Sequence, residues 1–147
     1  MTWYESMAFT RWLSAKTGEN IRLLAEGEWQ RAAQGDDNRD YPWGKEWDGA
    51  RCNNSVEPFD SNSTTPVTQY EGQGASPYGV VDMAGNVWEW TATDWQAGGE
   101  NIAGANPRVL RGGAWFDVDS DSFRAAVRVS RNPGNWDDNR GFRCARS

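Results

Sequence analysis

Hydrophobic and polar positions follow helical spacing at the start of the chain. Within residues 2–17 the apolar side chains recur every three to five positions, and Thr2 followed by Glu5 is a capping-box pattern. Gly18 then supplies a left-handed end, so the pattern predicts an amphipathic helix. The segment 25–35 predicts a second, shorter helix, because acidic residues open it and a glycine closes it.

The pattern changes after the second helix. Residues 36–80 are rich in Asp, Asn, Ser, Gly and Pro and show no periodicity, which predicts long ordered loops. Apolar and polar residues then alternate over 87–90, which predicts a strand that enters the core. We expect further strands in "RVLRGGAW" (108–115) and "NRGFRCARS" (139–147). Loops as long as 36–80 usually need an additional stabilising interaction. Their oxygen-rich side chains suit a hard cation such as Ca²⁺.

Composition indicates an aromatic core. Leu, Ile, Val and Phe are scarce, but ten Trp and sixteen Gly allow rings to pack between tight turns. The length of 147 residues fits one domain. A net charge of −6 argues against a nucleic-acid partner, since phosphate binding needs clustered cations. No signal peptide or transmembrane run is apparent, so we expect a soluble chain without membrane insertion.

The absence of histidine excludes most familiar catalytic centres. It removes the Ser-His-Asp triad, the Cys-His pair, histidine-based zinc sites and the two-histidine iron site. A carboxylate pair, Lys, Tyr or an unassisted Cys remain as catalytic groups. Cys52 and Cys144 are the only cysteines, and their spacing leaves open whether they form a disulfide.

Several motifs occur together and in one order along the chain. "YPWG", "SPYGVVDMAGNVWEWTATDW", "RVLRGGAW" and "NRGFRC" follow the helical opening. This series resembles the sulfatase-modifying, formylglycine-generating family, and the resemblance covers nearly the whole chain. It implies an α+β domain over 1–147 with an elaborated C-type lectin fold: two helices on a small antiparallel sheet, with extensive irregular loops.

The resemblance does not carry the family's catalytic centre with it. Formylglycine-generating enzymes use two cysteines shortly after the GG motif to bind copper, and the matching positions here are Asp117 and Ser122. Neither side chain is a soft ligand for Cu(I), and the iron-dependent relatives need histidines. We therefore expect neither copper nor iron and predict a protein that is not an enzyme. The alternative is an oxidase of the formylglycine-generating type, or another enzyme, with an altered centre.

The C-terminal segment also resembles the variable region of ligand-binding proteins diversified by retroelements. In those proteins adenines of a template are miscopied, which yields Asp, Ser, Val, Phe, Gly or Arg but not Glu, Lys, Gln or Met. Residues 116–138 hold five of the twelve Asp and none of those four excluded types. The resemblance implies a variable region of about 111–143 within a fixed frame. The frame comprises Arg111, Gly112, Gly113, Trp115, Arg124, Arg128, Pro133, Gly141, Phe142 and Arg143.

The positions between the frame residues are the expected contact surface for a protein or glycan ligand. A surface free of packing duties tolerates change, and exposed aromatic rings make good anchors. The ligand, the oligomeric state and the localisation are not specified by the sequence, although display on a cell surface or virus particle would suit recognition. The candidate contact residues are Phe116, Asp117, Val118, Asp119, Asp121, Val127, Val129, Ser130, Trp136, Asp137 and Asp138.

Calcium is the one cofactor that the resemblance implies. In the resembling family Ca²⁺ is held around the "DMAGNVWE" motif, and the matching donors here are Asp82, Gly85, Val87 and Glu89. A second site would fall near Asn53, Asn54 and Asp60. The alternative for the first site is that Glu89 pairs with an arginine of the GFR strand while Asn86 caps a turn.

Overall fold

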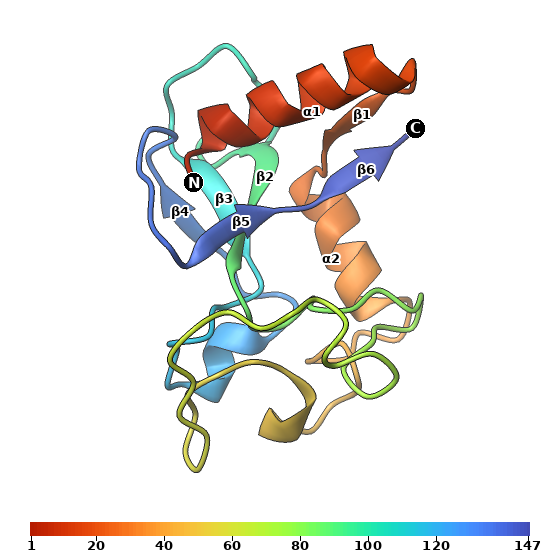
Figure 1. The fold of residues 1–147 in the computed structure, drawn as a ribbon, viewed down its shortest axis with the longest axis vertical. Helices are drawn as coiled ribbons and strands as arrows, with labels where there is room; N and C mark the ends of the chain where they lie inside the picture. Colours follow the sequence, from red (N-terminus) through yellow and green to blue (C-terminus); the bar gives the residue numbers. More distant parts are fainter.

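The computed structural model describes residues 1–147, and both helices lie close to their predicted positions (Figure 1). Helix α1 spans Trp3–Thr17, with Thr2 and Glu5 forming the capping box and Gly18 ending the helix at φ 73°. Helix α2 spans Glu26–Gln34 and buries Trp29 and Ala33. The capping residues therefore fix the helix ends where the sequence predicts them.

Six short strands form two sheets. The two-stranded sheet pairs β1 with β6, and the four-stranded sheet has the order β4-β3-β2-β5. The α+β class is confirmed, but the larger sheet is mixed rather than antiparallel, because β5 runs parallel to β2. The strands are β1 Ile21–Leu23, β2 Trp88–Asp94, β3 Arg108–Arg111, β4 Val129–Arg131, β5 Arg140–Phe142 and β6 Cys144–Arg146.

Strand β2 is buried along its whole length, on its polar side as well as on its apolar side. Its apolar side packs with α1 in a cluster that includes Trp3, Trp88 and Trp90. Its polar side faces α2: Glu89 accepts a hydrogen bond from the Trp29 indole at 2.6 Å, and the Thr93 hydroxyl accepts from the first amide of α2. The alternation is therefore present, and helix α2 covers the polar side through hydrogen bonds.

The sequence missed strands β1 and β4, which have three residues each and lack a detectable pattern. The loop prediction for 36–80 holds, since the region contains only one 3₁₀ turn, η1 (Gly49–Arg51), and one isolated β-bridge, between Tyr41 and Gly44. Figure 1 shows these loops gathered at one end of the molecule, away from α1. Aromatic rings help to hold them, because Tyr41 stacks on Trp43 and Trp47 stacks on Phe123 at a centroid distance of 5.1 Å.

Both cysteines are free thiols. Cys52 is buried, and burial raises its pKa to about 12. Cys144 is exposed on β6, although partial burial of its thiol also raises its pKa. We expect Ellman's reagent at pH 8 to modify Cys144 in the folded protein and Cys52 only after unfolding, because the thiolate is the reactive form. A Cys144→Ser variant serves as the control and should show no native reaction; equal rates for both thiols would contradict the placement of Cys52.

Neither helix combines the length and the apolar character needed to cross a lipid bilayer.

Candidate functional site

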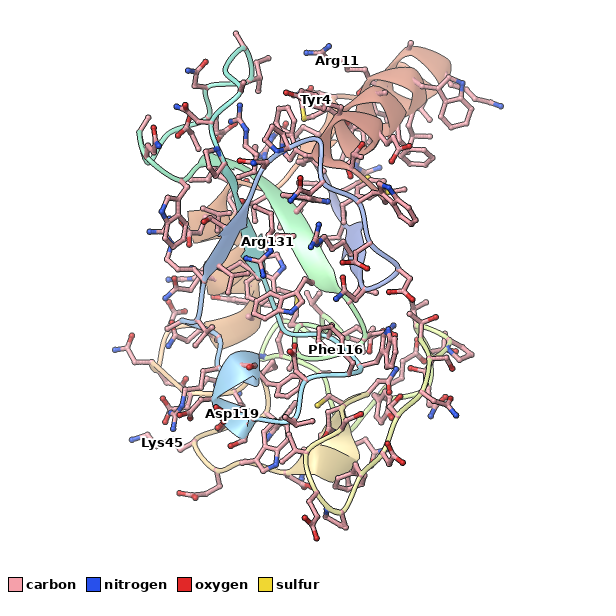
Figure 2. All side chains as sticks on the ribbon, turned by 90° about the vertical axis from the view of Figure 1, so that its left-hand side faces the viewer. Tyr4, Arg11, Lys45, Phe116, Asp119 and Arg131 are labelled. Atoms are coloured by element: carbon pink, nitrogen blue, oxygen red, sulfur yellow. The ribbon has the colours of Figure 1, made fainter.

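A cavity of about 320 Å³ opens beside the four-stranded sheet and collects residues from β2, β3, β4, β5 and the segment after β3. Figure 2 looks onto this side of the molecule, with Arg131 above Phe116 and Asp119 below. We call it the sheet cavity. Its lining residues are Trp88, Leu110, Phe116, Asp117, Ser122, Val129, Arg131, Asn139 and Arg140.

Two glycines turn the chain from β3 into the wall of the sheet cavity. Gly112 and Gly113 have φ values of 100° and 77°, a region that L-residues with side chains avoid. An added Cβ on Gly113 would clash with the ring of Phe123, which is fully buried. The buried ring therefore fixes the start of the segment that carries Phe116 and Asp117.

Short local hydrogen bonds hold the wall itself. Asp117 accepts from the amide of Ala114 at 2.8 Å and donates its own amide back to the Ala114 carbonyl at 3.0 Å. Asp119 caps the 3₁₀ helix η2 (Ser120–Phe123) by accepting from the amide of Asp121. The segment is thus a chain of turns that is also tied to its neighbours, because the Ser55 amide donates to the Asp117 carbonyl at 3.1 Å and the Trp115 amide donates to the Asn86 carbonyl at 3.0 Å.

Arg111 anchors the return of the chain toward β4. Its guanidinium donates to the carbonyls of Ala125 and Val127 at 2.8 and 2.9 Å, and it pairs with Glu26 of α2 at 2.9 Å. Its side chain is only 2% exposed, so this network is a buried one. Arg128 pairs with the same Glu26 at 2.8 Å. Two frame residues therefore join the irregular segment to a helix.

The parallel pairing of β5 with β2 brings the last two lining residues into place. The amide of Trp88 donates to the carbonyl of Asn139 at 2.9 Å, and Trp88 lies opposite Arg140 in the register. Arg140 is nearly buried, with its side chain 10% exposed. It has one distant ionic partner, Asp137, at 3.4 Å. A long-range pairing of this kind leaves no periodic trace in the sequence.

The two positions matched to catalytic cysteines do line one cavity. Asp117 is half-buried, and burial raises the pKa of its carboxyl, while the Ala114 amide and the Trp88 side chain act in the opposite direction. Ser122 contributes a hydroxyl, and the lining contains no cysteine. Oxygen donors of this type do not hold Cu(I), so the arrangement lacks thiolate chemistry. It offers instead a small polar cavity with aromatic walls.

The predicted contact residues divide by exposure. Phe116 is 42% exposed, Val118 73% and Trp136 74%. The aspartates 119, 121, 137 and 138 are also exposed. The expectation that all eleven positions project outward is wrong for Val127 and Val129, which pack against the core cluster around Trp90. Asp117 and Ser130 are half-buried as well.

Phe116, Asp117 and Val129 are the predicted contact residues that the structure brings together in the sheet cavity. Arg131, Asn139 and Arg140 line the same cavity and were not among the sequence candidates. The last two belong to the "NRGFR" motif, which was used to predict a strand. Their position was the one sequence signal for a binding role, because polar residues at the start of a predicted strand follow the variable segment directly.

The calcium donors around Glu89 are arranged as an ion pair. Both oxygens of Glu89 accept from Arg143, at 2.6 and 2.7 Å, and one also accepts from the Trp29 indole. A guanidinium at this place adds positive charge where a cation would sit, so the residues do not fit a Ca²⁺ ion as placed. The alternative pairing of Glu89 with the GFR arginine is confirmed. Asn86 bridges the loops, bonding Thr65 through both amide atoms.

Asp82 gives a direct test of this site. Both of its carboxylate oxygens are buried without a partner, and burial raises its pKa from 3.8 to about 6. Between those pH values the folded chain binds more protons than the unfolded chain, so stability falls as pH rises. In calcium-free buffer at pH 7 we expect Asp82→Asn to raise the free energy of unfolding by about 2–3 kcal/mol and to flatten this pH dependence.

Denaturant unfolding at pH 4.5 and pH 7, with and without 5 mM CaCl₂ as roughly saturating for a weak site, measures both effects. If calcium stabilises the natural chain and not the Asp82→Asn variant, the calcium ligand set predicted from the sequence stands and the ion-pair account of this site is wrong.

Comparison with known proteins places the whole chain in one group. The family described as "Sulfatase-modifying factor enzyme 1-like domain" matches residues 1–147. The chain is 38% identical to "Serine/threonine-protein kinase pkn1" of Chlamydia caviae over 99% of its length, and 33% identical to "Inactive C-alpha-formylglycine-generating enzyme 2" of Bos taurus over 99%. It is also 33% identical to "Formylglycine-generating enzyme" of Streptomyces coelicolor over 99%. The chain spans 23%, 48% and 51% of these three relatives.

Solved structures agree on the fold. PvdO from Pseudomonas aeruginosa superposes with a TM-score of 0.82 at 28% identity, covering 99% of this chain and 60% of that one. Treponema denticola variable protein 1 superposes with a TM-score of 0.81 at 23% identity, covering 98% of this chain and 68% of that one. These likenesses establish the formylglycine-generating, C-type lectin-like type of fold.

Proposed function

We propose that this chain, which belongs to the sulfatase-modifying factor enzyme 1-like family, is a non-catalytic binding domain whose contact surface surrounds the sheet cavity. The observation that carries the proposal is the lining of that cavity, where Asp117 and Ser122 stand at the two positions matched to catalytic cysteines. With neither thiol nor imidazole nearby, the cavity suits recognition better than oxidation.

Exposed side chains on the segments that also supply lining residues of the cavity form the proposed contact surface. Phe116 and Trp136 offer large apolar anchors, and the neighbouring aspartates add charge selectivity. We call the exposed set the rim: Phe116, Val118, Asp119, Asp121, Trp136, Asp137 and Asp138. Because these residues lie outside the strands, their side chains can change to fit partners of different shape while the sheet stays the same.

The finer proposal is that the rim is diversified by a retroelement, within a single domain whose variable region spans about 111–143. Two observations support it: the depletion of Glu, Lys, Gln and Met over 116–138, and the structural likeness to a protein titled a variable protein. The partner would be a protein or glycan, and surface or virus-particle display would suit that role.

Inspection of the DNA around the coding sequence tests the finer proposal. It expects a reverse transcriptase gene and a near-copy of the segment for 111–143 that differs only at adenines. Retroelement diversification is ruled out if the near-copy differs at bases other than adenine, or if the complete surrounding DNA contains no near-copy. Neither result bears on the binding role, which is tested separately.

An enzyme with an altered centre is the second candidate. The likeness to a protein named a formylglycine-generating enzyme favours it, since the matched segment covers half of that relative. The assay is mass spectrometry of a cysteine-containing sulfatase peptide after incubation with the chain, copper and oxygen. Our proposal expects no oxidised product beyond a protein-free control, and turnover that saturates with peptide would establish the enzyme.

A further inference from the structure

Two arginines line the sheet cavity without close neutralising partners. Arg131 on β4 is exposed, donates to the carbonyl of Ser130 and forms no ion pair. Arg140 reaches only Asp137, at 3.4 Å, which is long for a charge-assisted bond. The two cations influence each other, because Arg131 contributes to lowering the pKa of Arg140 after the larger effect of burial. An anion between them would relieve this repulsion.

Two residues of the cavity lining each have a buried polar atom without a partner in the protein. The atoms are Nη1 of Arg140 and Oδ1 of Asn139. Buried donors and acceptors are nearly always satisfied, so such a pair in one cavity indicates a ligand that supplies both an acceptor and a donor. An Asn side chain can present either its oxygen or its amide nitrogen, which suits a peptide group.

The remaining walls are apolar. Trp88, Leu110, Phe116 and Val129 contribute aromatic and aliphatic surface to a cavity of about 320 Å³. A highly charged anion such as a phosphate matches these walls poorly, and Asp117 in the same lining would repel it. A single carboxylate on an apolar stem matches them well.

We propose that the sheet cavity binds a carboxylate of a protein partner, with Arg131 and Arg140 donating to it and Asn139 bonding the adjacent peptide group. The apolar walls hold the side chain that bears or adjoins the carboxylate. This inference rests on the proposed binding function. It adds a second group of binding residues, which recognise a negative charge in the cavity. These are Arg131, Asn139 and Arg140, and none of them is a rim residue.

The chemistry fits either a chain terminus or an acidic side chain, and small probes separate the two. The full chain is labelled with ¹⁵N and titrated with N-acetylphenylalanine, its neutral amide, or N-acetylglutamic acid α-amide. We expect the first to bind with a Kd of about 1 mM, with shifts of the Asn139 and Arg140 amides, and the neutral amide to bind at least about tenfold more weakly. The glutamic acid probe shows whether a side-chain carboxylate suffices.

Substitutions in the cavity lining should change the affinity for N-acetylphenylalanine in opposite directions, which a loss of folding cannot do. Arg140→Gln should weaken binding of N-acetylphenylalanine at least about tenfold, and Arg131→Gln about threefold, because Arg131 is exposed and water screens its charge. Asp117→Asn keeps an acceptor for the Ala114 amide but removes a like charge, so it should strengthen binding about threefold. Arg11→Gln on α1, outside the cavity lining, is the matched control and should change nothing.

Equal binding of the acid and its neutral amide overturns the carboxylate assignment, and so does the absence of any shift with all three probes. In either case the rim can still bind a partner, which selection of binders from a rim library measures independently. Loss of carboxylate binding and loss of rim binding are therefore separate results.

Discussion

Replacing Glu89 by Gln is expected to lower the free energy of unfolding by about 3–5 kcal/mol, because it removes the main counter-charge of a largely buried guanidinium. Glu89 is 7% exposed, and its two oxygens accept from Arg143 at 2.6 and 2.7 Å. Burial lowers the pKa of Arg143, but the charge and hydrogen bonds of Glu89 outweigh this and raise it. The pair also links β2, α2 and the C-terminal strands through the Trp29 indole.

The control for this substitution is Glu28→Gln. Glu28 also forms a two-point pair, with Arg22 at 2.6 and 2.7 Å, but its side chain is 44% exposed. Exposed pairs contribute little, so the expected loss is at most about 1 kcal/mol. Urea unfolding of both variants measures the two losses in the free energy of unfolding. Similar losses for the two would show that the Glu89 pair is not a structural centre of the fold.

Gly85→Ala is expected to cost about 3–5 kcal/mol, since two independent penalties coincide at this residue. Gly85 has φ 78°, and an added Cβ would overlap the backbone carbonyl of Asn53. Neither backbone can move easily. Gly85 donates to the Gly112 carbonyl at 2.8 Å, and the Asn53 carbonyl accepts from Asn86 at 3.1 Å.

Gly98→Ala separates the two penalties. Gly98 has a similar φ of 71° and nothing within 4 Å of an added Cβ, so only the backbone strain of about 1 kcal/mol remains. Thermal unfolding of both variants gives the comparison. If Gly85→Ala is as stable as Gly98→Ala, the close contact between Gly85 and Asn53 does not fix the 36–80 loops against the start of β2.

The helices and the main strands were predictable because their signals are local. Thr2 with Glu5 at one end of α1, and Gly18 at the other, act within the segment that they delimit. The alternation in β2 also predicted a strand correctly. Its full burial was not predictable, because that depends on Glu89 and Thr93 meeting α2, an element some sixty residues earlier in the chain.

The candidate site was predictable only in its local part. Phe116 and Asp117 follow a recognisable glycine turn and were predicted as contact residues, but the cavity that they line was not predicted. Arg140 enters through the parallel pairing of β5 with β2, across some fifty residues. Val127 precedes the short strand β4 and Val129 begins it, in a stretch whose sequence resembles the exposed positions, and only their contact with the core distinguishes them.

The central claim is that the fold and the recognition surface are carried by different residues. A pooled library tests it most directly, by measuring thermal unfolding of variants randomised together at six rim positions. Asp119 is left unchanged because it caps η2. The randomised positions are Phe116, Val118, Asp121, Trp136, Asp137 and Asp138.

Surface substitutions away from buried networks change stability little, so most library members should melt within about 5 °C of the natural chain. The same number of random changes at buried frame and core positions should abolish folding. If most rim variants fail to fold, the rim carries the fold after all, and the proposal of a changeable recognition surface on a fixed scaffold is contradicted.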